Sequence, residues 1–185
     1  MKKLLLVLTA LLLASCIDVD DFGAAWDKAS VDPSVIGNWK QISASSTTAE
    51  NERNIGEITR ARLLEDALQI EHEFTNPEEA EDPIYPVKTM KIGSYHFFIT
   101  GPHNGGMVRY VVADNKITTY VLNAEATAAF IKKKFPKEKN VTKDIALNDP
   151  YIKIGIFNDE ATKILASIPE SDIYWHQQAV YEKAP

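Results

Sequence analysis

The chain has 185 residues, with 20 lysines and arginines against 26 aspartates and glutamates, one cysteine and a formal net charge of −6. Hydrophobic residues make up 45% of it and charged residues 25%, which is typical of a folded domain and excludes a disordered or fibrous chain. The acidic balance also argues against nucleic acid as a partner.

The first fifteen residues have the layout of a secretory signal peptide. Lys2 and Lys3 precede an apolar run over residues 4–13. A helix of that run is about 15 Å long, about half the thickness of the hydrocarbon core of a bilayer, so it is too short to span a membrane. A charged start, a short apolar centre and small residues before a boundary predict an exported protein.

The boundary itself, Leu13-Ala14-Ser15-Cys16, resembles the lipobox of bacterial lipoproteins. The resemblance implies that the leader is removed before Cys16, that the Cys16 sulfur carries diacylglycerol, and that the new amino group is often acylated. Each buried CH₂ contributes about 0.8 kcal/mol, so two or three acyl chains anchor stably. The alternative is a plain signal peptide with an accidental cysteine, although the only cysteine of the chain stands where lipidation needs it.

Lipidation would leave a mature chain of 170 residues with 18 basic and 26 acidic side chains, a net charge of −8. With its thiol in a thioether, this chain forms no internal disulfide and depends on its hydrophobic core. Cys16 is followed by Ile17, not by the aspartate that resembles an inner-membrane retention signal. The expected location is therefore the cell envelope, on the outer membrane facing the periplasm.

The mature chain is predicted to have two parts. Residues 16–34 are expected to be the lipidated cysteine and a flexible tether, because residues 17–34 contain five aspartates and few large apolar groups. Residues 35–185 are expected to form a single β-rich globular domain, a suitable length for one domain.

Strand-like runs dominate the domain. Apolar and polar residues alternate from Leu68 to Phe74, which predicts a half-buried strand. Further runs cover 84–91, 95–100, 107–113 and 116–122. Asp114-Asn115 predicts a tight two-residue hairpin, and residues 101–106 a longer glycine-rich hairpin loop.

Two helices are predicted to interrupt the strands. Asn123 and Asn158 each stand where a strand-like run gives way to a helical pattern, and asparagine is a favourable N-cap. The second helix has an apolar stripe that begins at Ala161 and stops before Pro169. The predicted fold is a β-rich α+β domain, an antiparallel β-meander or partly closed barrel with two short helices.

Two resemblances concern the domain. Gly37-Asn38-Trp39 resembles the Gly-x-Trp of lipocalins, which implies a barrel whose floor is closed by the tryptophan and a carrier function. Two interposed helices depart from the single helix of that family. From Gly37 to Lys183 the order of elements is similar to that of small bacterial lipoproteins, a similarity that carries no activity.

The favoured function is a membrane-anchored, non-catalytic binding or accessory module. Its predicted partner surface is an acidic face suited to a basic envelope protein, formed by Glu71, Glu73, Glu78, Glu79, Glu81 and Asp82. The first alternative is a carrier of a small apolar molecule. Its cup would be lined by Leu68, Ile70, Phe74, Tyr110 and Tyr120.

An acid–base hydrolase is the second alternative, with Glu71 and Glu73 or a histidine as the reacting groups. Strand alternation places both glutamates on the solvent side, where nothing perturbs their pKa values. The sequence has no Gly-x-Ser-x-Gly elbow, and its histidines lack zinc-site spacing: His72, His96, His103 and His176. We therefore expect no catalytic site, metal or cofactor, and the sequence leaves the oligomeric state open.

Overall fold

The computed structural model describes residues 17–45, 55–56, 58–73, 86–146 and 149–185. The strands are β1 (Ile17–Asp21), β2 (Gly37–Ala44), β3 (Ile58–Leu64), β4 (Ala67–Glu73), β5 (Pro86–Ile92), β6 (Tyr95–Thr100), β7 (His103–Ala113), β8 (Lys116–Leu122), β9 (Val141–Ala146), β10 (Asp149–Ile156) and β11 (Trp175–Lys183). The helices are α2 (Ala24–Lys28), α4 (Ala124–Lys134), α5 (Asp159–Ser167) and the single 3₁₀ turn η1 (Pro33–Val35). The predicted β-rich α+β class is confirmed.

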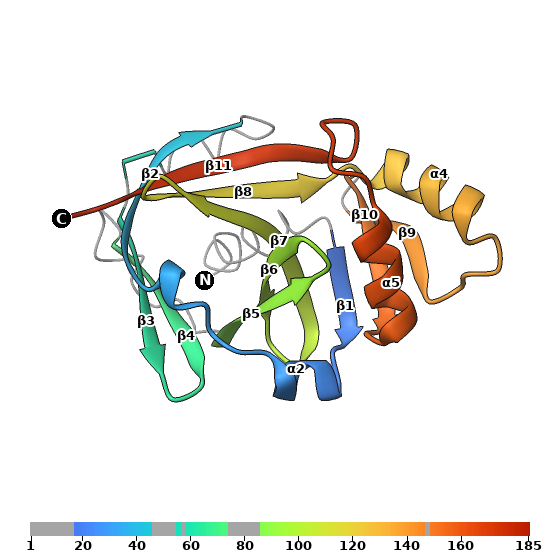
Figure 1. Cartoon of the computed structure of the whole chain (residues 1–185), viewed down its shortest axis with the longest axis horizontal. Helices are drawn as coiled ribbons and strands as arrows, with labels where there is room; N and C mark the ends of the chain where they lie inside the picture. Colours follow the sequence, from blue (N-terminus) through green and yellow to red (C-terminus); the bar gives the residue numbers. More distant parts are fainter. Residues whose placement is uncertain (1–16, 46–54, 57, 74–85, 147–148) are drawn as a thin grey trace, which may run out of the picture.

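All eleven of these strands belong to one sheet, and eight of them form a ring (Figure 1). The ring runs β6-β5-β4-β3-β2-β11-β8-β7 and closes where β6 pairs with β7. Because β7 is long, one of its edges pairs with β1 in its first half and with β8 in its second half. The parallel strand β10 and then β9 continue the sheet beyond β1, beside α4 and α5.

The tight turn that the sequence predicts at Asp114-Asn115 joins β7 to β8. Asp114 and Asn115 have φ values of 52° and 59°, the left-handed pair of a type I′ turn that matches the twist of a hairpin. The predicted strands over 95–100 and 116–122 agree with β6 and β8. Gly93, with φ of 61°, opens the two-residue turn between β5 and β6, and a Cβ there would lie 3.2 Å from the Cβ of Ala166 in α5.

Both predicted helix starts are also confirmed. The Asn123 side chain accepts a hydrogen bond from the Ala126 N–H at 3.0 Å, and Asn158 accepts one from the Ala161 N–H at 2.9 Å. Each bond satisfies an N–H that has no partner within its helix. The apolar stripe of α5 is buried, with Ile164 fully inaccessible to solvent.

The buried side chains form two clusters. The larger one joins α4 and α5 to β1, β10 and one face of β5, β6 and β7, and it includes Phe97 and Trp175. The smaller one, which we call the ring cluster, draws on η1 and six ring strands and therefore lies on the inner side of the ring. Its fully described members are Val35, Trp39, Ala61, Leu68, Val87, Tyr110 and Ile117.

The prediction of a flexible tether over residues 16–34 is wrong for the part that the structure describes. β1 lies between β7 and β10, and its Ile17 and Val19 side chains are buried in the larger cluster. The Ile-Asp-Val-Asp pattern is a strand signal of period two, outweighed in the sequence by the number of aspartates. Residues 24–28 and 33–35 follow as α2 and η1.

The predicted hairpin connection over residues 101–106 is only partly right: β6 and β7 form a hairpin whose mutual pairing stops at Ile99 and Met107, but β7 already begins at His103. Gly105 and Gly106 pair with Val19 and Asp18 of β1, so two glycines that suggest a loop are strand residues here. A Cβ on Gly105 would lie 1.8 Å from the carbonyl oxygen of Thr100, which explains why the position needs glycine.

Candidate functional site

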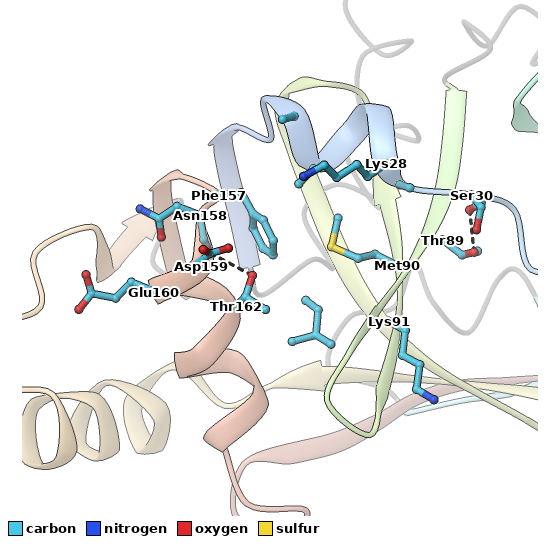
Figure 2. A pocket seen from close by; sticks show the side chains of 14 residues that line it. Lys28, Ser30, Thr89, Met90, Lys91, Phe157, Asn158, Asp159, Glu160 and Thr162 are labelled. Atoms are coloured by element: carbon cyan, nitrogen blue, oxygen red, sulfur yellow. Dashed lines mark hydrogen bonds between the residues drawn. The ribbon is translucent and has the colours of Figure 1, made fainter.

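An open cleft of about 740 Å³ lies between α2, β5 and the start of α5. Figure 2 shows Met90 of β5 and Phe157 beside the cleft, with Lys28 reaching across from α2. Asp159 lies on the opposite wall, in the first turn of α5. The cleft therefore combines apolar side chains with opposite charges on facing walls.

One end of the cleft is fixed by a hydrogen-bonded group around Asp32. The Thr89 N–H donates to the Ser30 carbonyl at 2.6 Å, and the Ser30 N–H donates to the Thr89 carbonyl at 3.3 Å. The Asp32 N–H donates to the Thr89 hydroxyl at 2.8 Å, and the Tyr110 hydroxyl donates to the Asp32 carboxylate at 2.9 Å. This network joins the segment after α2 to β5 and to the interior of the ring.

The network shifts two pKa values. Burial acts to raise the pKa of Asp32, but hydrogen bonds from Ser34 and Tyr110 outweigh it and hold that pKa below the ordinary 3.8. Burial, together with the hydrogen bond to Asp32, raises the pKa of Tyr110. Asp32 is therefore a carboxylate and Tyr110 a neutral donor at neutral pH.

We expect Asp32→Asn to lower the free energy of unfolding at pH 7 by about 1 kcal/mol, since a charge-assisted hydrogen bond is lost. A lowered native pKa stabilises the fold above the unfolded pKa, and this contribution is lost as pH falls through the native value. Urea titrations between pH 7 and pH 2.5 should show the gap between variant and wild type closing below 3.8. Asp27→Asn, at an exposed position of α2, is the control, and a gap for Asp32→Asn that stays constant with pH would contradict the assignment.

A second polar group is buried in the larger cluster. The Arg109 side chain is 5% exposed, and its guanidinium carbon lies 4.5 Å from the ring centre of Tyr95, 4.8 Å from Tyr120 and 5.1 Å from Trp175. The guanidinium forms an ion pair with Glu170, in the connection between α5 and β11. The Tyr95 hydroxyl donates to the Ile168 carbonyl at 2.6 Å, so the same connection is held twice.

The structure brings together part of the predicted ligand cup. Leu68 and Tyr110 belong to the ring cluster, and Ile70 packs against it. The Tyr110 ring stacks on Phe98 with centroids 4.1 Å apart. Phe74 lies outside the described residues.

Tyr120 does not join the other cup residues. It pairs with Arg109 across β7 and β8, and its ring lies against the guanidinium in the larger cluster. Neighbouring strand residues point to opposite faces, so a residue that shares the face of Arg109 cannot share that of Tyr110. Sequence alternation within β8 alone does not reveal which face is inside.

The predicted acidic face is only partly within the described structure. Glu71 and Glu73 are residues of β4, which pairs with β3, but their side chains lie outside the described part. Glu78, Glu79, Glu81 and Asp82 lie outside it altogether.

Three of the four histidines have described side chains, and these lie apart from one another. The His96 ring packs edge-on to Tyr110 at 5.8 Å, His103 lies 3.1 Å from the Asp21 carboxylate, and His176 lies 3.3 Å from the Asn123 amide. Among the described residues, no group of three or more histidine, cysteine, aspartate or glutamate side chains is placed to hold a metal ion.

Sequence reasoning missed both the cleft and the Arg109 group. The cleft depends on Ser30 pairing with Thr89, 59 residues further along the chain. The Arg109 guanidinium contacts aromatic rings from β6, β8 and β11, and no local sequence pattern predicts a contact between residues so far apart in the chain. The comparisons supply no further guide, since no family model, no curated protein and no solved structure matches the chain significantly.

Proposed function

We propose that the protein is a lipid-anchored, non-catalytic binding module of the cell envelope, held on the outer membrane through Cys16. The carrying observation is the Leu13-Ala14-Ser15-Cys16 sequence after a charged and apolar leader, with no second cysteine in the chain. None of the helices in the described ranges has the length and apolarity that crossing a bilayer requires.

The described side chains support binding rather than catalysis. The cleft between α2, β5 and α5 is open to solvent and carries the opposite charges of Lys28 and Asp159 on facing walls. At one end of the cleft, the Asp32 carboxylate accepts hydrogen bonds from Ser34 and Tyr110 and has a structural role. A general acid or base at neutral pH would instead need a pKa shifted towards 7.

The carrier function has weaker support. A carrier needs inner surface that a ligand can reach, whereas the Tyr110 ring is 1% exposed and its hydroxyl is bonded to Asp32. Its faces are in contact with Phe98 and His96. Tyr110, one of the predicted cup residues, is thus already engaged by the protein.

Mass spectrometry and fractionation test the anchor. In a Gram-negative host, the wild-type chain should begin at Cys16, carry a mass increment of acyl chains and sediment with the membranes. Cys16→Ser should abolish the increment and leave the protein outside the membrane fraction, because the acyl chains supply the membrane affinity. Ser15→Ala, which keeps a small residue before the cysteine, should leave both unchanged. An unmodified Cys16 thiol in the wild-type protein would refute the proposal.

A further inference from the structure

We propose that the cleft between α2, β5 and α5 binds an extended peptide segment of a partner protein, which adds as a short strand to the open edge of β5 at Lys91. The inference gives a partner class to the proposed binding module. It does not depend on lipidation of Cys16.

The hydrogen-bonding pattern of β5 identifies the open edge. The two-residue turn at Gly93 and Ser94 makes Ile92 and Tyr95 a hydrogen-bonded pair. The backbone N–H and C=O groups of Ile92, Met90 and Lys88 therefore point towards β6. The backbone groups of the residues between them point to the opposite edge of β5, as the two backbone hydrogen bonds between Thr89 and Ser30 show. Lys91 is the next residue on that edge.

The edge of β5 that faces away from β6 has backbone partners at Val87 and Thr89, but none among the described residues at Lys91. Val87 pairs with Leu68 of β4, and Thr89 pairs with Ser30. For Lys91, the described part of the chain offers no backbone partner on this edge. An open N–H and C=O beside a cleft are the groups that strand addition uses.

The path of the chain explains why the edge is open. An antiparallel strand continuing from the Ser30–Thr89 pair would place Lys28 opposite Lys91. Lys28 is instead the last residue of α2, and the Ala29 N–H bonds to the Ala25 carbonyl at 3.0 Å to close that helix. Because residues 24–28 form a helix, they do not continue as a strand beside Lys91, and the cleft lies next to that edge of β5.

The walls of the cleft specify the peptide further. The half-buried Met90 offers apolar surface to a side chain of the peptide, with the buried Ile92 and Phe157 behind it. Lys28 on one wall favours an acidic side chain, and Asp159 on the other favours a basic one. The Lys91 side chain points away from the middle of the cleft in Figure 2, so its backbone is the recognition element.

These features favour a peptide over a small apolar ligand. A small apolar ligand uses the apolar surface and leaves the N–H and C=O of Lys91 to water, whereas an extended chain uses the apolar surface and hydrogen-bonds to both groups. Binding should therefore require free amide groups on one edge of the peptide. We expect a segment of alternating β-branched residues with opposite charges at its two ends.

The test uses the full chain in detergent micelles and two fluorescent probes with blocked ends, Glu-Thr-Val-Thr-Val-Thr-Lys and its reversed sequence. Two probes are needed because a strand can add in either direction. Fluorescence anisotropy measures binding, and amide hydrogen exchange measures protection at Lys91. Peptides N-methylated on alternate residues, in each of the two registers, report on which peptide edge is bonded.

Lys91→Pro removes the open donor and leaves the β5–β6 hydrogen bonds in place, because the Lys91 N–H faces away from β6. Lys91→Ala keeps the donor and removes the charge, and is the matched control. We expect at least one probe to bind saturably, the proline variant to weaken it by about tenfold or more, and the alanine variant to stay within about twofold.

Methylation in one register should weaken binding by about tenfold, methylation in the other should have little effect, and exchange at Lys91 should slow when the probe binds. If the proline variant does not fold, the methylated peptides and the exchange at Lys91 decide the question. The proposal is overturned if neither probe binds up to about 1 mM. It is also overturned if both registers of methylation are tolerated, if Lys91 gains no protection, or if the proline variant folds and binds like wild type. The acylation of Cys16, measured on the same preparation, separates these failures from a failure of the anchor.

Discussion

Gly105→Ala is expected to lower the free energy of unfolding by about 3 kcal/mol or more, because the added methyl group overlaps backbone that has no room to move. Its Cβ would lie 1.8 Å from the Thr100 carbonyl oxygen and 3.0 Å from the Phe22 ring. Gly105 also pairs with Val19, so relief of the overlap would separate β7 from β1. Chemical denaturation followed by circular dichroism measures the loss.

Gly155→Ala is the matched control, because Gly155 is a strand glycine in β10, on the other side of β1. Its Cβ would meet only the Oδ1 atom of Asn140, at 3.0 Å, and a side-chain end can shift. We expect a loss below about 1 kcal/mol at this position. Equal losses in the two variants would show that the overlap with Thr100 is not the cause.

Arg109→Ala should cost about 3 kcal/mol, since it removes a long side chain from a closed space between three aromatic rings. The guanidinium lies within 5.1 Å of the ring centres of Tyr95, Tyr120 and Trp175 and pairs with Glu170. The variant should also loosen the connection between α5 and β11, which hydrogen exchange at residues 168–174 would detect. A loss below about 0.5 kcal/mol would contradict this account.

Arg109→Met separates packing from charge, because methionine fills similar space without a charge. Burying the guanidinium costs desolvation that often cancels its attraction to Glu170, whose side chain stays 67% exposed. We therefore expect the methionine variant to retain more than half of the stability that the alanine variant loses. If both variants lose the same stability, the cation–π contacts and the ion pair with Glu170 contribute most of the energy.

Local signals in the sequence predicted much of the ring. The hairpin at Asp114-Asn115 and the caps at Asn123 and Asn158 depend on neighbouring residues only, and all three are confirmed. The failures concern partners that are distant in sequence. β1 is a strand because it pairs with β7 on one side and β10 on the other. Both partners are distant in sequence, so the sequence around the β1 aspartates does not reveal this pairing.

The candidate site was less predictable than the fold for the same reason. The cleft exists because α2 ends where Ser30 reaches Thr89, and this geometry joins residues from three separate segments. The predicted cup wrongly included Tyr120, because the face on which a β8 residue lies depends on the pairing of β8 with β7. Periodicity indicates that a strand has two faces, and only the tertiary structure decides which one is inside.

The position of β1 has a mechanical consequence. Ile17, the residue after the proposed acylation point, is already paired on both sides, with Met107 of β7 and Ile152 of β10. With acyl chains on Cys16, a pull along β1 would be shared by two rows of hydrogen bonds loaded in shear, which must yield together. If Cys16 is acylated, the folded body would stand directly on the leaflet, without the flexible spacer that the sequence predicts.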